Sequence, residues 1–240
     1  MTKKIIKILG LLSIFISIII VTLITYFYQT SYNPERSLFE QIQNNSMLSI
    51  TENSDYYSLK PQILRPNKDS IIYYTGGLVK PESYLYKMGQ VAIRKQVNIY
   101  VIKPFANLAI LNINQANKVF ENEKINKAQI GGHSLGGVVA CRFTKNNPTR
   151  ISKLFLFGSY CDQDISNLNN LQTVSIVGKN DKITKPESYN KAKINLPSNT
   201  TFLEPEGLNH SDFGNYGLQK DDQKSDLSND EIIKILDQVL

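Results

Sequence analysis

The residues Gly131-Gly132-His133-Ser134-Leu135-Gly136-Gly137 follow a short apolar run at positions 127–130 and precede a helix-compatible segment at 138–143. Their Gly-x-Ser-x-Gly spacing is typical of a nucleophile elbow, the sharp turn from a strand into a helix that lifts a serine hydroxyl clear of a sheet. Glycines two residues before and after the serine let the turn approach its flanking elements closely. The pattern therefore predicts Ser134 as a nucleophile, against the alternative of a glycine-rich turn with an incidental serine.

The chain after Pro66 alternates between short apolar runs and amphipathic segments. Such alternation is typical of a parallel sheet with helices on both faces, so we expect an α/β fold with a mostly parallel, doubly wound sheet. A β-hairpin at 47–51 and 56–59 precedes it. Strands are predicted at 70–74, 97–102, 127–130, 151–157, 172–177 and 200–203, and helices at 82–95, 112–122, 135–145, 186–192 and 229–240. The loop at 158–171 is too short to hold a large cap domain.

An uncharged segment of 21 residues, 8–28, follows three lysines near the start of the chain. It is apolar on every face, is long enough to span a bilayer, and ends in three aromatic residues. A cleaved signal peptide would have a shorter apolar core and small residues at a cleavage site. We therefore expect residues 1–28 to form a cytoplasmic stub and one transmembrane signal-anchor, rather than a buried core helix.

The positions of the lysines also predict which side of the membrane the rest of the chain occupies. Lysines flanking a membrane span favour the cytoplasm, so the protein should be a single-pass protein of the cell membrane with its domain on the outer side. The polar residues 29–46 are predicted to be a tether, and residues 47–240 the folded domain.

Charge and cysteine content exclude other classes of protein. Three lysines account for half of the net charge of +6, and no run of Lys or Arg follows them, so we expect no nucleic-acid partner. Cys141 and Cys161 are expected at the same end of the sheet, either as a disulfide or as buried free thiols. We favour free thiols, because the chain has no dense cysteine framework. With two cysteines and two histidines, a metal site is not expected.

A serine hydroxyl attacks readily at neutral pH only when an imidazole takes its proton, and a carboxylate must fix the tautomer of that imidazole. His133 lies directly before Ser134, so its side chain should point away from the hydroxyl and serve packing or hydrogen bonding. His210, in a loop after the last predicted strand, is therefore the expected base. The alternative is that His210 is a structural loop histidine.

The expected acid is Asp181, which ends a strand and turn, Ser175-Ile176-Val177-Gly178-Lys179-Asn180-Asp181. The order Ser134, Asp181, His210 is the one that this architecture uses. Asp162 and Asp164, after the preceding strand, are the competing candidates.

The backbone around two glycine-bearing turns is predicted to form an oxyanion hole. The amide of Leu135, at the start of a helix, is one donor. The second should come from Gly77 or Leu78 in Thr75-Gly76-Gly77-Leu78-Val79, with Leu78 lining the pocket. A plain type II turn is the alternative there.

Taken together, these residues resemble the α/β-hydrolase superfamily, and more narrowly a small, poorly characterised bacterial branch of it. The resemblance covers roughly residues 70–240. It rests on the stretches 73–84, 103–109, 132–137, 178–181 and 209–217 in order. It implies the α/β-hydrolase fold without a large cap, Ser134 as nucleophile, Asp181 as acid, His210 as base, and an oxyanion hole at Leu135 and near Gly77. Thr75 departs from the pattern, because many relatives have proline or histidine before these glycines.

The sequence thus predicts a membrane-anchored serine hydrolase that cleaves carboxylic esters or thioesters of a small-molecule or acylated substrate, with no cofactor. An amidase or peptidase with the same triad is the nearer alternative. The second alternative is a binding module that keeps the hydrolase fold but has no catalytic activity.

Overall fold

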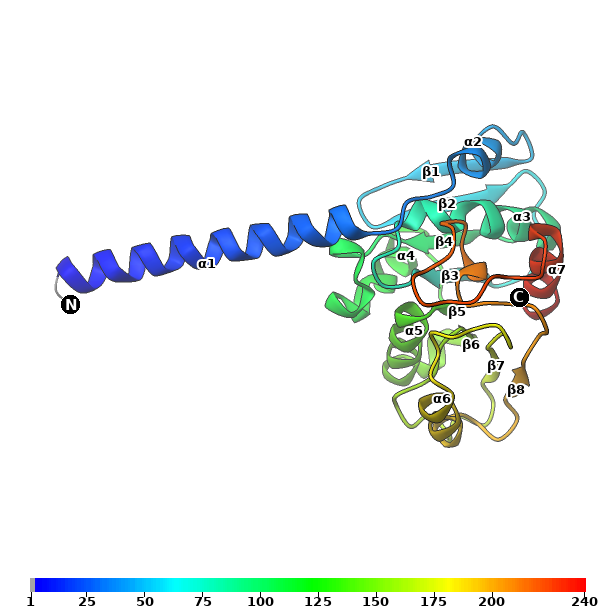
Figure 1. Ribbon diagram of the computed structural model, residues 1–240. Coiled ribbons are helices and arrows are strands. Elements are labelled where there is room, and N and C mark those ends of the chain that lie inside the picture. The colour runs from blue at the N-terminus through cyan, green and yellow to red at the C-terminus, as the bar shows by residue number, and fades with distance from the viewer. Residues whose placement is uncertain (1–2) are drawn as a thin grey trace.

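The computed structural model describes residues 3–240, in which eight strands form one sheet (Figure 1). The strands lie in the order β1-β2-β4-β3-β5-β6-β7-β8. Strand β2 is antiparallel to both of its neighbours, and β3 to β8 run parallel to one another. The strands are β1 (Leu48–Glu52), β2 (Tyr56–Pro61), β3 (Ser70–Tyr74), β4 (Ile99–Ile102), β5 (Ala128–His133), β6 (Ile151–Phe157), β7 (Gln172–Ile176) and β8 (Thr201–Leu203). The predicted α/β class and mostly parallel sheet are confirmed.

The central strands of the sheet are buried on both faces, and successive side chains of each strand point to opposite faces. In β3, Ile71 and Tyr73 pack into one hydrophobic cluster, while Ile72 and Tyr74 pack into the other. The four side chains are fully buried. A continuous apolar strand therefore serves two cores at once, and this explains why the predicted strands read as unbroken apolar runs.

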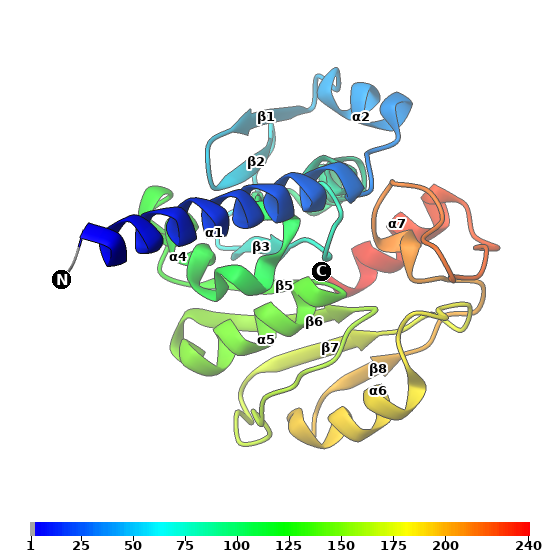
Figure 2. The same cartoon turned by 60° about the vertical axis from the view of Figure 1, so that its left-hand side comes forward.

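Helices cover the two faces in separate groups (Figure 2). On one face, α2 (Arg36–Gln43) and α7 (Asn229–Val239) both pack against α3 (Leu85–Lys95). On the other, α4 (Ala116–Asn122) and α5 (Leu135–Asn146) contribute to the second cluster, and Tyr189 of α6 (Pro186–Ala192) meets Ser175 of β7 at 3.1 Å between hydroxyl oxygens. The sheet is thus doubly wound, as predicted.

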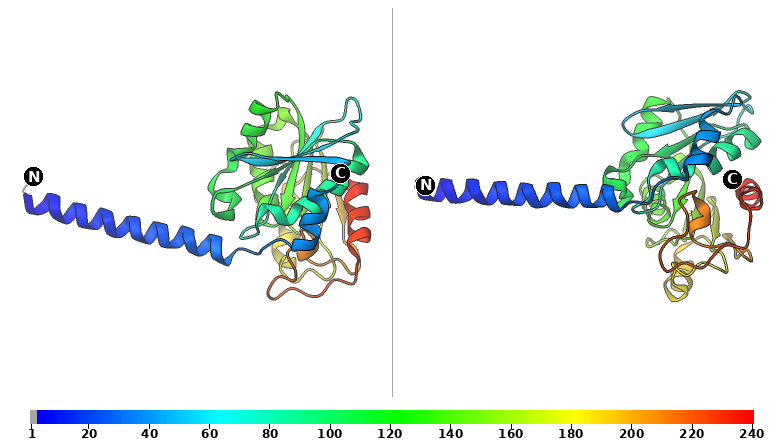
Figure 3. Two further views of the ribbon diagram at one scale, coloured as in Figure 1. Left: turned by 90° about the horizontal axis from the view of Figure 1, so that it is seen from above. Right: turned by 45° about the horizontal axis from the view of Figure 1, so that its top comes forward.

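Helix α1 (Lys3–Thr30) stands away from the domain as a single long rod (Figures 1 and 3). Its segment Ile6–Thr30 is long and apolar enough to cross a membrane, and none of its most apolar window is buried in the protein. A helix that is apolar all round and unburied cannot be a core helix, so that alternative is excluded. The chain therefore has one N-terminal candidate for a transmembrane helix.

The segment after α1, expected to be a polar tether over 29–46, is folded onto the domain. Ser31 is buried, and Tyr32 forms a parallel bridge with Val79 in the loop after β3. Helix α2 follows, and its Ile42 is fully buried in the first cluster. The sequence analysis missed this helix because it has only eight residues, too few to show a helical period, although Leu38, Phe39 and Ile42 all pack on the first cluster.

Strands β6 and β7 are joined by an irregular loop, 158–171, so the predicted lack of a large cap at this position is confirmed. The same loop corrects the prediction for the cysteines. Cys141 of α5 and Cys161 of the loop form a disulfide, with their Cα atoms 5.5 Å apart, and are not free thiols. Their shared position at one end of the sheet, rather than their number, brings them together.

Candidate active site

Ser134 lies between β5 and α5 in a conformation that few residues other than glycine adopt, with φ 52° and ψ −123°. Its neighbours leave no room for side chains. A Cβ atom added to Gly132 would lie 2.4 Å from the carbonyl oxygen of Tyr74, and one added to Gly136 would lie equally close to it. The Ser134 amide also donates to the carbonyl of Phe157, at 2.9 Å. The turn is therefore a strained strand-to-helix elbow held between β3 and β6, as the sequence predicts.

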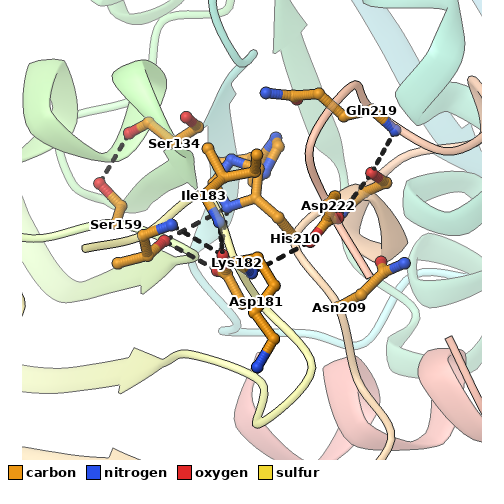
Figure 4. Close-up of polar contacts among 12 residues, drawn as sticks. Ser134, Ser159, Asp181, Lys182, Ile183, Asn209, His210, Gln219 and Asp222 are labelled. Carbon is orange, nitrogen blue, oxygen red and sulfur yellow. Dashed lines mark hydrogen bonds and ion pairs between the residues drawn. The ribbon is translucent and has the colours of Figure 1, made fainter. Parts of the chain in front are cut away.

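His210 and Asp181, predicted from separate stretches of the chain, form a buried pair (Figure 4). The Nδ1 atom of His210 lies 2.9 Å from Oδ2 of Asp181. Because the carboxylate oxygen can only accept when ionised, Nδ1 carries the proton in this contact. The opposite ring nitrogen, Nε2, is then left as a free acceptor.

Asp181 is held by donors on both of its oxygens. Oδ1 accepts from the amides of Ile183 and Thr184 at 2.9 and 2.8 Å, and Oδ2 accepts from the Thr184 hydroxyl at 2.7 Å. Burial acts to raise the pKa of Asp181, but its hydrogen bonds to His210 and Thr184 outweigh burial and lower that pKa below the ordinary value. The carboxylate is therefore ionised at neutral pH.

Ser134 and His210 line the same pocket, which has a volume of about 430 Å³. The pocket lies at the carboxyl edge of the parallel strands, where the loops after β5, β6, β7 and β8 meet. The Nε2 atom of His210 is buried and has no hydrogen-bond partner among residues 3–240. The other lining residues are Leu135, Val138, Gly158, Ser159, Tyr160, Ile183, Thr184, Lys185 and Ser188.

The two competing carboxylates, Asp162 and Asp164, are engaged elsewhere. Asp162 accepts three hydrogen bonds from the guanidinium of Arg142: Nε lies 3.2 Å from Oδ1 and 3.0 Å from Oδ2, and an Nη atom lies 2.5 Å from Oδ2. Asp164 accepts from the amide and hydroxyl of Ser166, at 3.0 and 2.7 Å. Neither contacts a histidine in the described hydrogen bonds.

His133 is buried beside His210 and does not line the pocket. Its Nδ1 atom lies 3.0 Å from the hydroxyl of Tyr84, and its ring centroid is 4.5 Å from that of His210. Burial, together with the nearby His210, holds the pKa of His133 well below its ordinary value. A neutral ring is therefore packed against His210, consistent with the packing and hydrogen-bonding role expected of His133.

Of the two candidate oxyanion donors in the turn after β3, only the amide of Gly77 is free to donate in the part of the chain that the structure describes. The Leu78 amide donates to the carbonyl of Asn107 at 2.8 Å, and Leu78 does not line the pocket, which corrects that half of the prediction. The amides of Gly77 and Leu135 have no acceptor among residues 3–240. A Cβ atom added to Gly77 would lie 3.1 Å from Cδ2 of Leu135, so the two residues are neighbours.

Two buried or half-buried groups that the sequence analysis missed brace the loop of His210. Asp222 accepts from the Ser211 amide at 3.0 Å through one oxygen and from the Lys182 amide at 3.1 Å through the other, so it joins the loop of His210 to that of Asp181 (Figure 4). Lys87 donates to the carbonyls of Asp212 and Gly214, at 2.6 and 2.8 Å. Burial lowers the pKa of Lys87 to about 8. No local pattern in the sequence predicts the contacts of Asp222 or of Lys87.

Within residues 3–240, no group of three or more His, Cys, Asp and Glu side chains is placed to hold a metal ion.

Comparison with known proteins agrees with the fold. A family model described as "Alpha/beta hydrolase family" matches residues 70–234, so the chain belongs to the alpha/beta hydrolase family. No curated protein matches the chain.

Solved structures with the same fold have little sequence in common with the chain. A predicted CIB-like hydrolase from Thermoplasma acidophilum has a TM-score of 0.61 and 13% identity, covering 80% of this chain and 97% of its own. Naproxen esterase from Bacillus subtilis has a TM-score of 0.54 and 10% identity, covering 77% and 90%. A bacterial membrane phospholipase A has a TM-score of 0.56 and 9% identity, covering 88% and 93%. At these identities the likeness is one of fold.

Replacement of the acid tests the assignment of the carboxylate. Asp181→Asn is expected to lower kcat about a thousandfold or more, because the imidazole loses the acceptor that fixes its tautomer. Asp162→Asn and Asp164→Asn serve as controls and should change kcat little. Loss of activity in either control, with Asp181→Asn active, would place the carboxylate on the preceding strand.

Replacement of Gly158 tests how closely the surrounding backbone packs against His210 and Asp181. This glycine has φ +51°, and an added Cβ would lie 2.9 Å from Nδ1 of His210 and 3.3 Å from Oδ2 of Asp181. Gly158→Ala should therefore displace the pair and lower kcat about a hundredfold. Gly217→Ala is the matched control, because Gly217 has φ +80° and open space around it. Both variants should lose about 1–2 kcal/mol of stability from the left-handed backbone. Equal kcat values in the two variants would contradict the predicted confinement.

Proposed function

We propose that the protein is a membrane-anchored serine hydrolase that cleaves carboxylic esters or thioesters through an acyl-enzyme. The observation that carries the proposal is the buried contact of His210 Nδ1 with Asp181 Oδ2, which leaves Nε2 unpartnered at the pocket that Ser134 also lines. A binding module has no need of this arrangement next to a strained serine turn.

In the proposed reaction, the Ser134 hydroxyl attacks the acyl carbon while His210 Nε2 takes its proton. His210 then gives this proton to the departing alcohol or thiol, and the acyl group stays on Ser134 as an ester. Water, activated by the same nitrogen, releases the acid and restores the serine. Asp181 stays ionised throughout and stabilises the imidazolium, a role that its lowered pKa supports.

The oxyanion that forms during each attack is proposed to lie between the amides of Leu135 and Gly77. Both amides are free of acceptors among residues 3–240, and they belong to neighbouring residues. The Leu135 amide is also the first of helix α5, where the helix dipole favours negative charge. Fixed donors of this kind stabilise the transition state more than the planar carbonyl of the substrate.

The leaving group is not decided by these residues, because amidases and peptidases use the same triad. The absence of a large cap in the loop 158–171 favours short acyl groups, or a chain presented end-on, over a substrate that must be enclosed. Ester and thioester cleavage is proposed first because an alcohol or a thiol is a better leaving group than an amine, so its departure depends less on the proton that His210 delivers.

The membrane topology is proposed to have the amino terminus in the cytoplasm and the catalytic domain outside. The lysines before the apolar helix support this orientation. The disulfide between Cys141 and Cys161 supports it independently, since disulfides persist in oxidising compartments and are rare in the cytosol.

Labelling with a fluorophosphonate probe tests the mechanism. The wild-type protein should be labelled at Ser134 and should hydrolyse p-nitrophenyl esters, tested over a series of acyl lengths, whereas Ser134→Ala should do neither. Equal labelling of wild type and Ser134→Ala would refute the assignment of the nucleophile. Labelling without turnover of any ester would keep the nucleophile and reject the substrate class.

Protease protection tests the topology. In intact cells that carry the full chain, added protease should cleave the domain. Cys141 and Cys161 are buried, so in the denatured protein a thiol-reactive polymer should modify them only when a reductant is present. A domain that is cut only after lysis would reverse the proposed orientation.

A further inference from the structure

We propose that the segment 105–111 rests in the interface of the bilayer that holds α1, so that the pocket at Ser134 takes esters carried by that bilayer. The inference builds on the proposed membrane anchor and ester hydrolysis, and names the surface that would bring such a substrate to the site. It follows from three features: the rigid junction of α1 with the domain, the length of the apolar helix, and an apolar surface between the junction and the pocket.

No flexible linker separates α1 from the domain, because hydrogen bonds hold the end of the helix and the residues after it. The Tyr28 hydroxyl accepts from the amide of Ala106 at 3.2 Å, and Ser31 Oγ accepts from Asn107 Nδ2 at 2.8 Å. Tyr32 then pairs with the loop after β3: its amide donates to Leu78 at 2.8 Å, and its carbonyl accepts from Lys80 at 3.0 Å. The domain is therefore fixed directly to the end of the helix (Figures 1 and 3).

The length of the helix places this junction at the membrane surface. The uncharged run of 21 residues, 8–28, spans about 31 Å as a helix, which matches the thickness of about 30 Å of a hydrocarbon core. Its end thus coincides with the boundary of the headgroup layer. Since Tyr28 contacts Ala106, the turn Phe105–Asn107, where the segment 105–111 begins, lies at the same depth.

The side chains of this segment suit that depth. Phe105 is 54% exposed in the turn Phe105–Asn107, which touches α1, and Leu111 is 57% exposed at the end of the next turn, Ala109–Leu111. Phe105 lines a pocket of about 580 Å³ together with Tyr28, Lys80 and Lys103, and the carboxylates of Asp55 and Glu82 also lie in its wall. Aromatic and aliphatic side chains bordered by lysines and tyrosine are typical of a surface that lies in a membrane interface.

Apolar side chains also connect this surface with the reacting serine. A Cβ atom added to Gly77 would lie 3.8 Å from Cδ2 of Leu108 and 3.1 Å from Cδ2 of Leu135. Leu108 belongs to the segment 105–111, and Leu135 lines the pocket of Ser134. An acyl chain leaving the bilayer thus meets leucines on both sides of the proposed oxyanion donor. We infer that the substrate is an acyl ester of a membrane lipid in the leaflet at this end of α1.

A single tryptophan can report whether the surface meets lipid, because the chain contains none. The full-length Phe105→Trp variant is placed in phosphatidylcholine vesicles, with and without lipids brominated on the upper acyl chain. Leu64→Trp is the matched control: Leu64 is 52% exposed and follows β2, which runs antiparallel to β4 and so ends at the opposite edge of the sheet. Brominated lipid should quench most of the emission of Phe105→Trp and little of that of Leu64→Trp.

Equal quenching of the two reporters, or no quenching of either, would overturn the proposed surface. A blue-shifted emission of Phe105→Trp that bromine does not quench would mean that a protein covers the segment, either a second copy or another partner, and would overturn it as well. These outcomes do not depend on whether the protein hydrolyses any ester.

Activity measurements test the substrate class. The rate on a fluorogenic diacylglycerol ester in the vesicles is divided by the rate on soluble p-nitrophenyl butyrate. Phe105→Ser combined with Leu111→Ser should lower this ratio roughly tenfold, because two apolar side chains leave the lipid. The matched pair Ile63→Ser and Leu64→Ser, 55% and 52% exposed in wild type, should leave it unchanged. An unchanged ratio in the first pair would refute the inference even if soluble esters are cleaved. Failure of wild type on every ester would instead refute the proposed function.

Discussion

The strained backbone of Ser134 is the constraint on which the rest of this molecule depends. A residue with φ 52° and ψ −123° persists only where the surrounding structure allows no other conformation. Around Ser134, Gly132 and Gly136 pack against the carbonyl of Tyr74 and impose this conformation. The same close contact sets the spacing of β3, β5 and α5. Since Gly77 follows β3 and Leu135 begins α5, the packing that strains the serine also brings the two free amides together.

Much of this arrangement could be predicted from the sequence because it is local or follows from topology. The Gly-x-Ser-x-Gly spacing indicates the elbow directly. The side chains of Asp181 and His210 meet because parallel strands end at one edge of a sheet, so two loops far apart in sequence share a place in space. Strand β6 and helix α6 have the predicted bounds, since both are closed by turn residues, whereas β5 extends three residues further, through both glycines, to His133.

The remaining features depend on contacts that no local pattern encodes. The hydrogen bond of Leu78 to Asn107 joins loops that follow different strands, so only the structure could choose between Gly77 and Leu78. Asp222 lies in a stretch rich in acidic and amide residues, and nothing in its sequence neighbourhood marks it as the carboxylate that joins the loops of Asp181 and His210. The disulfide likewise forms only because the loop 158–171 brings Cys161 next to Cys141 of helix α5.

The bridge between Tyr32 and Val79 bears on whether the hydrolase-fold domain can exist apart from helix α1. A protease that cut between α1 and α2 would release the domain and could take Tyr32 with the helix. The carbonyl of Leu78 and the amide of Lys80 would then lose their partners, directly beside the proposed oxyanion donor Gly77. The domain is therefore poorly suited to shedding: a soluble fragment that begins at α2 would carry all three proposed catalytic side chains but an unsupported oxyanion loop.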